Sequence, residues 1–293
     1  MPTAEINGTE IYYEIHGSGF SLVFVHGGYG GLGTGAAPSN PDWLDKFTDD
    51  FQVILADRRS SGRSGFPEEP HTMEQFSADI VGLLDQLGHD RAYVWGTSAG
   101  GPITIQFGLS HPEMTTSLVV TDTAPWLTED DDIKARLKER IGILEAEGGD
   151  AAYAVRREGG TVGLQLFSAS RPAADEAEKQ QSEERAAAIR APLGAIPCEV
   201  RIAKYAGELR TYRAYVDWDA TETFGSLAKP VLVLYGTGDT VFPDVDWASL
   251  AEGHDNITYR EYPRAEHGIT GAHPEALTEI RQFVRDASPT TAG

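Results

Sequence analysis

The sequence predicts an α/β fold: a mostly parallel eight-stranded sheet with helices on both faces and an inserted helical cap. Short apolar runs alternate with segments of helical periodicity along most of the 293 residues, which is typical of parallel strands joined by crossover helices. The alternation stops once, between about Pro125 and Leu227, where helical patterns dominate and no buried strand is evident. We therefore expect a core domain formed by residues 1–124 and 228–293, and a cap formed by residues 125–227.

The strands are predicted from residue type and turn signals. Residues 4–6 and 9–15 flank Asn7-Gly8, a favoured two-residue hairpin turn, and predict an antiparallel hairpin at the start of the sheet. The later strands are short apolar runs, as expected for strands buried on both faces of a parallel sheet. They are residues 21–25, 51–56, 92–95, 118–121, 231–235 and 257–262.

The helices are predicted from apolar periodicity and end signals. Residues 73–87 place five apolar side chains on one face and end before Gly88, which is a helix stop signal. Residues 99–109 and 274–286 have similar patterns, as do 133–147 and 173–190 in the cap. We expect Thr128 to cap the first cap helix, with the acidic residues 129–132 in its first turn. In open α/β sheets, ligands bind at the carboxyl ends of the strands, where the cap would lie.

The composition excludes several classes of function. The 45 acidic residues outnumber the 24 basic ones and give a net charge of −21, which repels nucleic-acid backbones and anionic lipid surfaces. We find neither an apolar run of membrane-spanning length nor a secretory signal at the N-terminus, so we expect a cytoplasmic protein without a membrane partner. The single cysteine, Cys198, rules out an intrachain disulfide and a cysteine-rich zinc site.

A G-x-S-x-G motif carries the chemistry. Residues 96–100, Gly-Thr-Ser-Ala-Gly, directly follow one predicted strand and lead into a predicted helix, which is the context this motif requires. The glycines permit the tight turn that raises Ser98 above the sheet. The following helix directs its N-terminal amides toward developing negative charge. Ser98 is therefore the candidate nucleophile.

A serine hydroxyl needs a base to take its proton, and the base needs a carboxylate to orient it. His267 lies in the loop between the last strand and the last helix, and Asp239 follows the preceding strand. Because the carboxyl ends of parallel strands meet at one edge of the sheet, we expect Ser98, His267 and Asp239 to come together there. Asp122, at the end of the strand before the cap, is the alternative acid. No metal-binding signature such as H-E-x-x-H is present.

Taken together, these motifs resemble the α/β-hydrolase fold superfamily over nearly the whole chain. The residues that carry the resemblance are His26-Gly27-Gly28, the segment 57–64, the Ser98 turn, Gly238-Asp239 and His267-Gly268. The resemblance implies that the backbone N–H groups of Gly28 and Ala99 form an oxyanion hole, and that residues 57–64 order a loop beside the site. Within the family, His26-Gly27-Gly28 and the glycines after it resemble prolyl aminopeptidases, and the chain also has some resemblance to esterases. The chain departs from the aminopeptidases at Tyr29, where they usually have Pro, and at Ala99, where they have Trp.

The sequence therefore predicts a serine hydrolase that cleaves an ester, a lactone or a related acyl bond of a small molecule, with no cofactor and no metal. Tyr29, Trp126 and Trp218 are candidate substrate-binding residues. Three alternatives stay open. A C–C bond hydrolase would use the same triad, and a prolyl-type aminopeptidase would need cap carboxylates near Tyr29 to hold an ammonium group. A small-molecule receptor would bind its ligand without turnover. The acyl preference and the oligomeric state are unspecified.

Overall fold

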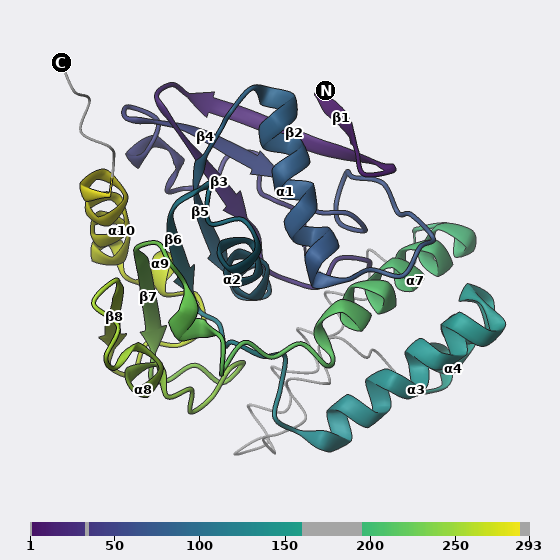
Figure 1. The fold of residues 1–293 in the computed structure, drawn as a ribbon. Coiled ribbons are helices and arrows are strands. Elements are labelled where there is room, and N and C mark those ends of the chain that lie inside the picture. Colours follow the sequence, from purple (N-terminus) through teal and green to yellow (C-terminus); the bar gives the residue numbers. More distant parts are fainter. Residues whose placement is uncertain (1, 33–34, 160–194, 288–293) are drawn as a thin grey trace.

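The computed structural model describes residues 2–32, 35–159 and 195–287 (Figure 1). A single eight-stranded sheet has the order β1-β2-β4-β3-β5-β6-β7-β8. The pairs β1–β2 and β2–β4 are antiparallel and every other pair is parallel. This confirms the predicted sheet with its antiparallel start. The strands are β1 (Thr3–Ile6), β2 (Thr9–Gly17), β3 (Phe20–Val25), β4 (Phe51–Ala56), β5 (Ala92–Thr97), β6 (Thr115–Thr121), β7 (Val231–Gly236) and β8 (Ile257–Tyr262).

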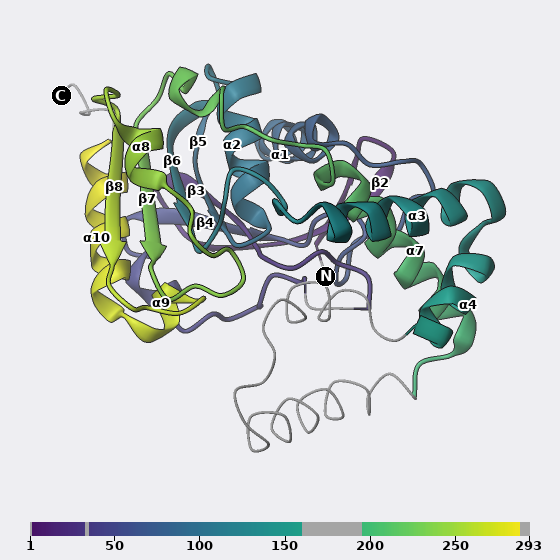
Figure 2. The ribbon, with the colours of Figure 1, turned by 90° about the horizontal axis from the view of Figure 1, so that it is seen from below.

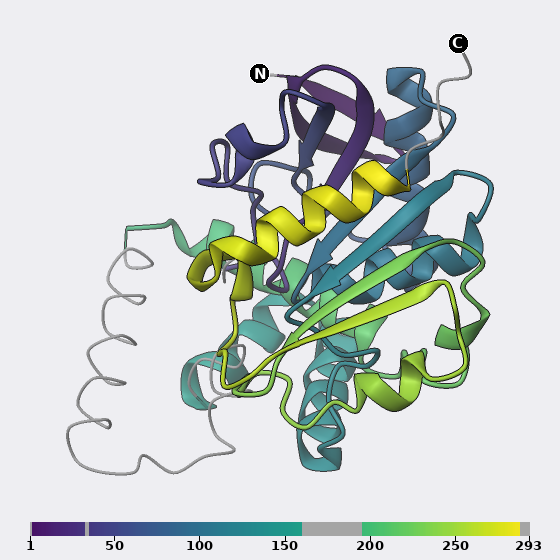
Figure 3. The same cartoon turned by 90° about the vertical axis from the view of Figure 1, so that its left-hand side faces the viewer.

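Helices cover both faces of the sheet, as Figure 3 shows from the side of α10. Helices α1 (Met73–Leu87) and α2 (Gly100–Ser110) pack on one face, and α10 (Pro274–Asp286) crosses the other. Shorter elements complete the core: η1 (Leu44–Lys46), η2 (Phe224–Ser226), α8 (Trp247–Ala251) and α9 (Ile269–Ala272). Strands β3 to β7 are mostly buried because two separate apolar clusters flank them. The expectation of burial on both faces was wrong for β8, which lies at the edge of the sheet and has only Ile257 buried.

Helix α1 begins and ends where its sequence signals lie. The Thr72 side chain accepts a hydrogen bond from the Gln75 N–H at the N-terminus, and Gly88 adopts a left-handed φ of 76° just after the last turn. The predicted apolar face, including Phe76 and Ile80, is buried against the sheet. Local chemistry thus determines both ends of this helix.

The segment between β6 and β7 contributes α3 (Asp131–Glu147), α4 (Gly149–Gly159) and α7 (Cys198–Tyr215), which contact one another and lie beside the core (Figure 2). The predicted helix 133–147 corresponds to α3, whereas the predicted helix 173–190 lies outside the described residues. The expected N-cap was wrong: Asp130, not Thr128, accepts from Asp132 N and Ile133 N. The Thr128 hydroxyl accepts from Asp130 N, two residues earlier in the chain than Asp132 N.

The inserted helices share the apolar cluster that covers the α1 and α2 face of the sheet. Leu137 of α3 and Leu209 of α7 are both fully buried in it. Gly207 and Glu208 of α7 pack closely on core loops, because a Cβ at Gly31 would lie 2.4 Å from the Glu208 Cβ. The inserted segment therefore rests directly on the loops that follow β3 and β4. Among the described helices, none has the length and apolarity required to cross a membrane.

Candidate active site

Ser98 lies on the sharp turn between β5 and α2. Its φ of 52° is in the left-handed region, a strained position for a residue with a side chain. The flanking glycines are required by packing. A Cβ at Gly96 would lie 2.3 Å from the Gly100 carbonyl oxygen, and a Cβ at Gly100 would lie 2.1 Å from the Val25 carbonyl oxygen. The turn is thus the strand–turn–helix arrangement that the motif predicts.

A continuous hydrogen-bonded chain links the three predicted residues. The His267 Nε2 lies 3.1 Å from the Ser98 Oγ, and the His267 Nδ1 lies 2.8 Å from the Asp239 Oδ2. The Asp239 side chain is 1% exposed and that of His267 is 29% exposed. These distances leave the imidazole able to take a proton from the serine while the carboxylate holds its other nitrogen.

The two candidate acids occupy different positions. The Asp239 Oδ1 accepts from the N–H groups of Val241 and Phe242, so its Oδ2 is directed at His267. The Asp122 Oδ1 instead accepts from the N–H groups of Gly268 and Ile269, at 2.9 Å each. Asp239 therefore contacts the imidazole of His267, whereas Asp122 holds the backbone immediately after it.

The electrostatic surroundings of His267 favour its protonated form. Burial lowers the pKa of His267, but the hydrogen bond and charge of Asp239, together with the charge of Asp122, outweigh that effect and raise the pKa above its usual 6.5. Asp122 itself has a raised pKa because it is buried, against the lowering effect of its two backbone N–H donors. The imidazole of His267 therefore binds a proton more strongly than a free imidazole does.

The loop after β3 that carries Gly28, one of the two residues predicted to form an oxyanion hole, approaches Ser98 at Gly27. A Cβ at Gly27 would lie 2.9 Å from the Ser98 Cβ, and Gly28 follows it with a φ of 75°. Within the described parts of the chain, the N–H groups of Gly28 and Ala99 donate to no protein acceptor. Their role as donors to a ligand oxygen stays a prediction.

The peptide groups that carry these N–H donors are fixed by hydrogen bonds to their carbonyl oxygens. The Ser98 carbonyl shares a peptide with the Ala99 N–H and accepts from the Thr123 Oγ1 at 2.8 Å. The Gly27 carbonyl shares a peptide with the Gly28 N–H and accepts from the His26 Nδ1 at 2.8 Å. Since a carbonyl can only accept, His26 carries its proton on Nδ1. Burial, with the nearby charge of Arg58, lowers the pKa of His26 well below 6.5, so its ring is neutral.

Asp122, Asp239 and His267 are close enough to share a metal ion, with ligand atoms within 4.8 Å of one another. Three of the four carboxylate oxygens, however, already accept hydrogen bonds of 3.0 Å or less from backbone N–H groups or from the imidazole. An ion here would have to displace these donors. The donor set fits a hydrogen-bonded triad better than a metal centre.

The three aromatic candidates for substrate binding lie in different surroundings. Tyr29 stacks on Tyr212 of α7, with ring centroids 4.4 Å apart. Trp126 pairs with Asp219 in an isolated bridge and lines a groove of about 170 Å³ together with residues that follow β7. The Trp218 Nε1 donates to the Gln106 Oε1 at 2.8 Å, which fixes its indole against α2. Their role in substrate binding stays a prediction.

Sequence reasoning missed two residues that shape this site. Thr123 supports the nucleophile turn, although no motif identifies it. Arg58 was expected only to order a loop, yet its side chain reaches the glycine-rich loop next to Ser98. The one available signal was its place directly after a strand, at the edge of the sheet where ligands bind.

Comparisons with known proteins agree with this geometry. Residues 21–144 match a family described as alpha/beta hydrolase fold. The chain is 31% identical over 282 residues to a putative carbamate hydrolase, RutD, of a Caulobacter species, covering 94% of this chain and 95% of that one. Among solved structures, the enol-lactonase from Burkholderia xenovorans is 22% identical, with a TM-score of 0.70 and coverage of 97% of this chain and 100% of that one.

A thermophilic esterase from Thermogutta terrifontis has a TM-score of 0.69 at 21% identity and covers 99% of this chain and 100% of its own. At such identities these two structures show the fold alone. The relative at 31% identity, matched over almost its whole length, shows the family as well. By sequence, fold and motif together, the chain belongs to the α/β-hydrolase family of enzymes.

Proposed function

We propose that the chain is a serine hydrolase that cleaves the acyl bond of a small ester, lactone or related carbonyl compound through an acyl-enzyme intermediate. The observation that carries this proposal is the chain of hydrogen bonds from the Ser98 Oγ through His267 to Asp239, at 3.1 and 2.8 Å. Each residue then has the partner that its chemical role requires.

In the first half of the reaction, the Ser98 Oγ bonds to the substrate carbonyl carbon while its proton passes to the His267 Nε2. Asp239 stabilises the imidazolium that forms, consistent with its raising effect on the pKa of His267. The carbonyl oxygen becomes an oxyanion and accepts from the N–H groups of Gly28 and Ala99. A preorganised donor of this kind lowers the barrier by about 3 kcal/mol.

Collapse of the tetrahedral intermediate breaks the bond to the leaving group, which takes the proton from the His267 Nε2. A water molecule then attacks the acyl-enzyme, giving its proton to the same nitrogen. The second collapse releases the acid and returns the proton to the Ser98 Oγ. No step needs an electron acceptor or a metal ion.

A carbamate is the second candidate substrate class. The specific observation is the full-length similarity, at 31% identity, to a protein named as a putative carbamate hydrolase. A carbamate carbonyl passes through the same kind of tetrahedral oxyanion as an ester carbonyl, so the same residues serve both. The nitrogen substituent makes the carbonyl less electrophilic, and slower acylation is expected.

The test is to measure hydrolysis by the wild type and by Ser98→Ala across short and long p-nitrophenyl esters, lactones, carbamates, a prolyl anilide and a vinylogous diketone. We expect turnover of esters, lactones or carbamates by the wild type, and a loss of at least 10³-fold in Ser98→Ala. Ser110→Ala, at the exposed far end of the same helix α2, is the matched control and should retain full activity. Equal rates for wild type and Ser98→Ala on every substrate would contradict the proposal, and Ser98-dependent cleavage of only the anilide or the diketone would replace the substrate class.

A further inference from the structure

We propose that Arg58 and Tyr215 act together as positioning residues for the oxyanion hole. They hold in place the glycine-rich loop after β3, which carries Gly28, and the turn that carries Ala99, and they thereby make hydrolysis depend on the contact of α7 with the core. This inference rests on the proposed function, because it concerns the donors assigned there to Gly28 and Ala99. It assigns a role in turnover to one residue after β4 and one at the end of α7. Neither residue is part of the triad.

Arg58 ties the glycine-rich loop from the core side. Its guanidinium donates to the carbonyl oxygens of Gly27, at 3.4 Å, and Gly28. Its own backbone N–H donates to the His26 Nε2 at 3.2 Å, and the other nitrogen of that ring donates to the same Gly27 carbonyl. The side chain is buried, and no carboxylate of the described residues pairs with it. A buried cation is costly unless it is hydrogen-bonded, so these carbonyls are its main compensation.

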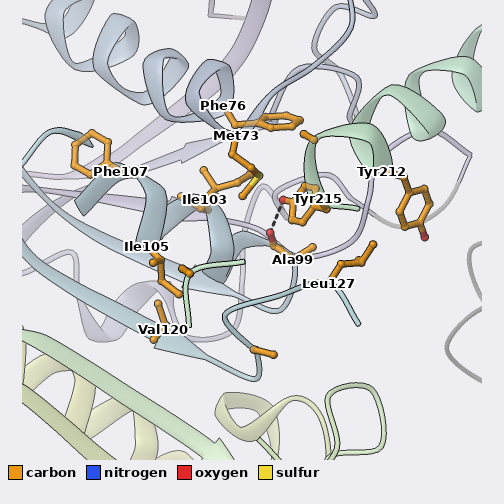
Figure 4. Packing of buried hydrophobic residues seen from close by; sticks show 14 of the residues in the cluster. Met73, Phe76, Ala99, Ile103, Ile105, Phe107, Val120, Leu127, Tyr212 and Tyr215 are labelled. Carbon is orange, nitrogen blue, oxygen red and sulfur yellow. Dashed lines mark hydrogen bonds between the residues drawn. The ribbon is translucent and has the colours of Figure 1, made fainter. Parts of the chain in front are cut away.

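Tyr215 ties the nucleophile turn from the α7 side. Its hydroxyl donates to the Ala99 carbonyl at 2.5 Å and accepts from the Arg58 guanidinium at 2.9 Å. Figure 4 shows the Tyr215 ring directed at Ala99, with the hydrogen bond drawn between them. Tyr215 is fully buried, and Phe76 of α1 packs beside it. One hydroxyl thus joins the turn that carries Ser98 to the arginine that holds Gly28.

The consequence is a single bridge between the two halves of the oxyanion hole. The Tyr215 hydroxyl bonds to Ala99, whose N–H is one predicted donor. The Arg58 guanidinium bonds to the carbonyl of Gly28, whose N–H is the other predicted donor, and to the Gly27 carbonyl, which belongs to the same peptide group as that N–H. A cation on that carbonyl polarises the peptide and strengthens its N–H as a donor. The glycine-rich loop also has positive φ at Gly28, Gly30 and Gly31, a backbone that needs external contacts to stay in one conformation.

The bridge also couples the site to α7. Tyr215 is the last residue of that helix, and Tyr29 of the glycine-rich loop packs between Tyr212 and Tyr215 at ring-centroid distances of 4.4 and 5.2 Å. If α7 moved away, Ala99 would lose its hydroxyl donor and Arg58 would lose an acceptor. The oxyanion hole is therefore complete only with α7 in contact.

Tyr215→Phe tests the bridge because it removes one oxygen and keeps the ring. We expect kcat on the best substrate of the panel to fall about tenfold, equivalent to about 1.4 kcal/mol, with KM within about twofold of the wild type. A boronic acid that forms a tetrahedral adduct on Ser98 should lose affinity by a similar factor. The ether analogue of that substrate, in which a CH₂ group replaces the carbonyl, can form no oxyanion and should bind as it does to the wild type.

Tyr205→Phe is the matched control. Tyr205 is a fully buried tyrosine on the same helix, and its hydroxyl accepts from Arg140 at 3.4 Å rather than from Arg58. Its removal should leave kcat and boronic-acid affinity unchanged. Arg58→Lys keeps the charge but not the forked donors, so it should lower kcat further than Tyr215→Phe does, again with little change in KM.

The outcomes separate this inference from the proposed function. Ser98-dependent hydrolysis with wild-type kcat and boronic-acid affinity in Tyr215→Phe would overturn the bridge and leave the proposed function intact. A rise in KM with unchanged kcat would also overturn it, because it would assign Tyr215 to ground-state binding. If Tyr215→Phe and Tyr205→Phe lowered both the melting temperature and the activity to the same extent, the role of Tyr215 would be structural only. Hydrolysis independent of Ser98 would reject the proposed function, and this inference with it.

Discussion

At the scale of single residues, two buried carboxylates next to one histidine have different tasks. Asp239 accepts from the imidazole at 2.8 Å, while Asp122 accepts from the two N–H groups that follow it. Both carboxylates raise the pKa of His267, Asp239 through a hydrogen bond and charge and Asp122 through charge alone. Sequence reasoning left both open as the triad acid because both follow strands of the parallel sheet, and only the fold decides which one faces a ring nitrogen.

Replacing each carboxylate by its amide should separate these tasks. In Asp239→Asn the amide no longer fixes the tautomer that the proposed mechanism needs, so kcat should fall by about 10³- to 10⁴-fold. In Asp122→Asn the triad keeps its contacts, and kcat should fall by about tenfold or less. Steady-state kinetics on one ester will measure both, and equal losses in the two variants would contradict the assignment.

The pH dependence of Asp122→Asn gives an independent prediction. His267 must be neutral to act as a base, so kcat/KM of the wild type should fall as the pH drops through a pKa above 6.5. The Asp122 charge raises that pKa. Removing the charge lowers the pKa, and the acid limb of the profile should therefore move to lower pH. A limb that stays in place or moves upward would show that Asp122 does not act on His267.

At the scale of elements, a buried ion pair joins the loop after β4 to helix α1. The Arg59 guanidinium donates two hydrogen bonds of 2.6 Å to the Asp79 carboxylate, which also accepts from the Asn7 amide in the first hairpin. Burial raises the pKa of Asp79, and Arg59 and Asn7 act against that rise. Three elements far apart in the sequence thus meet at one carboxylate.

Removing this carboxylate should destabilise the fold strongly. Asp79→Ala leaves the Arg59 charge buried without its partner, and we expect the free energy of unfolding to fall by about 3–5 kcal/mol. Arg59→Met combined with Asp79→Leu removes both charges and should lower the free energy of unfolding by less than Asp79→Ala does. Urea denaturation followed by circular dichroism will compare them. Glu145→Ala, which breaks the exposed pair with Arg213, is the control and should cost under about 1 kcal/mol.

The elements also show how far sequence reasoning extends. The bounds of α1 could be predicted from its apolar periodicity and from Gly88, because these signals are local, and the structure adds Thr72 as the N-cap. The N-cap of α3 was placed wrongly at Thr128, because both side chains can accept from backbone N–H groups and the sequence does not show which ones each reaches: the Thr128 hydroxyl accepts from Asp130 N, and the Asp130 carboxylate accepts from the N–H groups of the first turn. The contact of Arg58 with Tyr215 spans 157 residues. No local pattern encodes such a contact, since it depends on how the inserted helices pack on the core.

At the scale of the whole molecule, two buried titratable groups should limit stability from opposite sides of the pH range. Burial, with the charge of Arg59 and other nearby arginines, lowers the pKa of His71 to about 3. Burial raises the pKa of Glu208 to about 7, against the nearby charges of Arg156 and Arg140. His71 bonds to the Ser60 hydroxyl at 2.8 Å, and Glu208 packs on Gly31. Glu208 therefore lies at the contact between α7 and the loop after β3. His71 lies close to the contact of α7 with the loop after β4, because its partner Ser60 packs on Gly207.

The sign of each contribution follows from the proton balance between the folded and unfolded chains. Below pH 6.5 the unfolded chain protonates His71 and the folded chain does not until about pH 3, so stability falls as the pH drops through that window. Above pH 4.5 the unfolded chain ionises Glu208 and the folded chain does not until about pH 7, so stability falls as the pH rises. Between pH 4.5 and 6.5 the two slopes oppose each other.

Glu208→Gln should therefore stabilise the protein only at higher pH. The amide has no proton to lose, so the difference in unfolding free energy between the variant and the wild type should grow from pH 4.5 to 7. Above pH 7 it should level off at about 3 kcal/mol. Denaturant titrations at intervals of half a pH unit will measure this difference, with Glu199→Gln, exposed in the first turn of the same helix, as the matched control. Parallel curves for Glu208→Gln and the wild type would mean that Glu208 is already ionised in the folded protein. A difference that grows with pH would instead show that Glu208 stays protonated in the folded protein until about pH 7. The cause would be the contact between α7 and the core, which removes water from the carboxyl group and so disfavours its charged form.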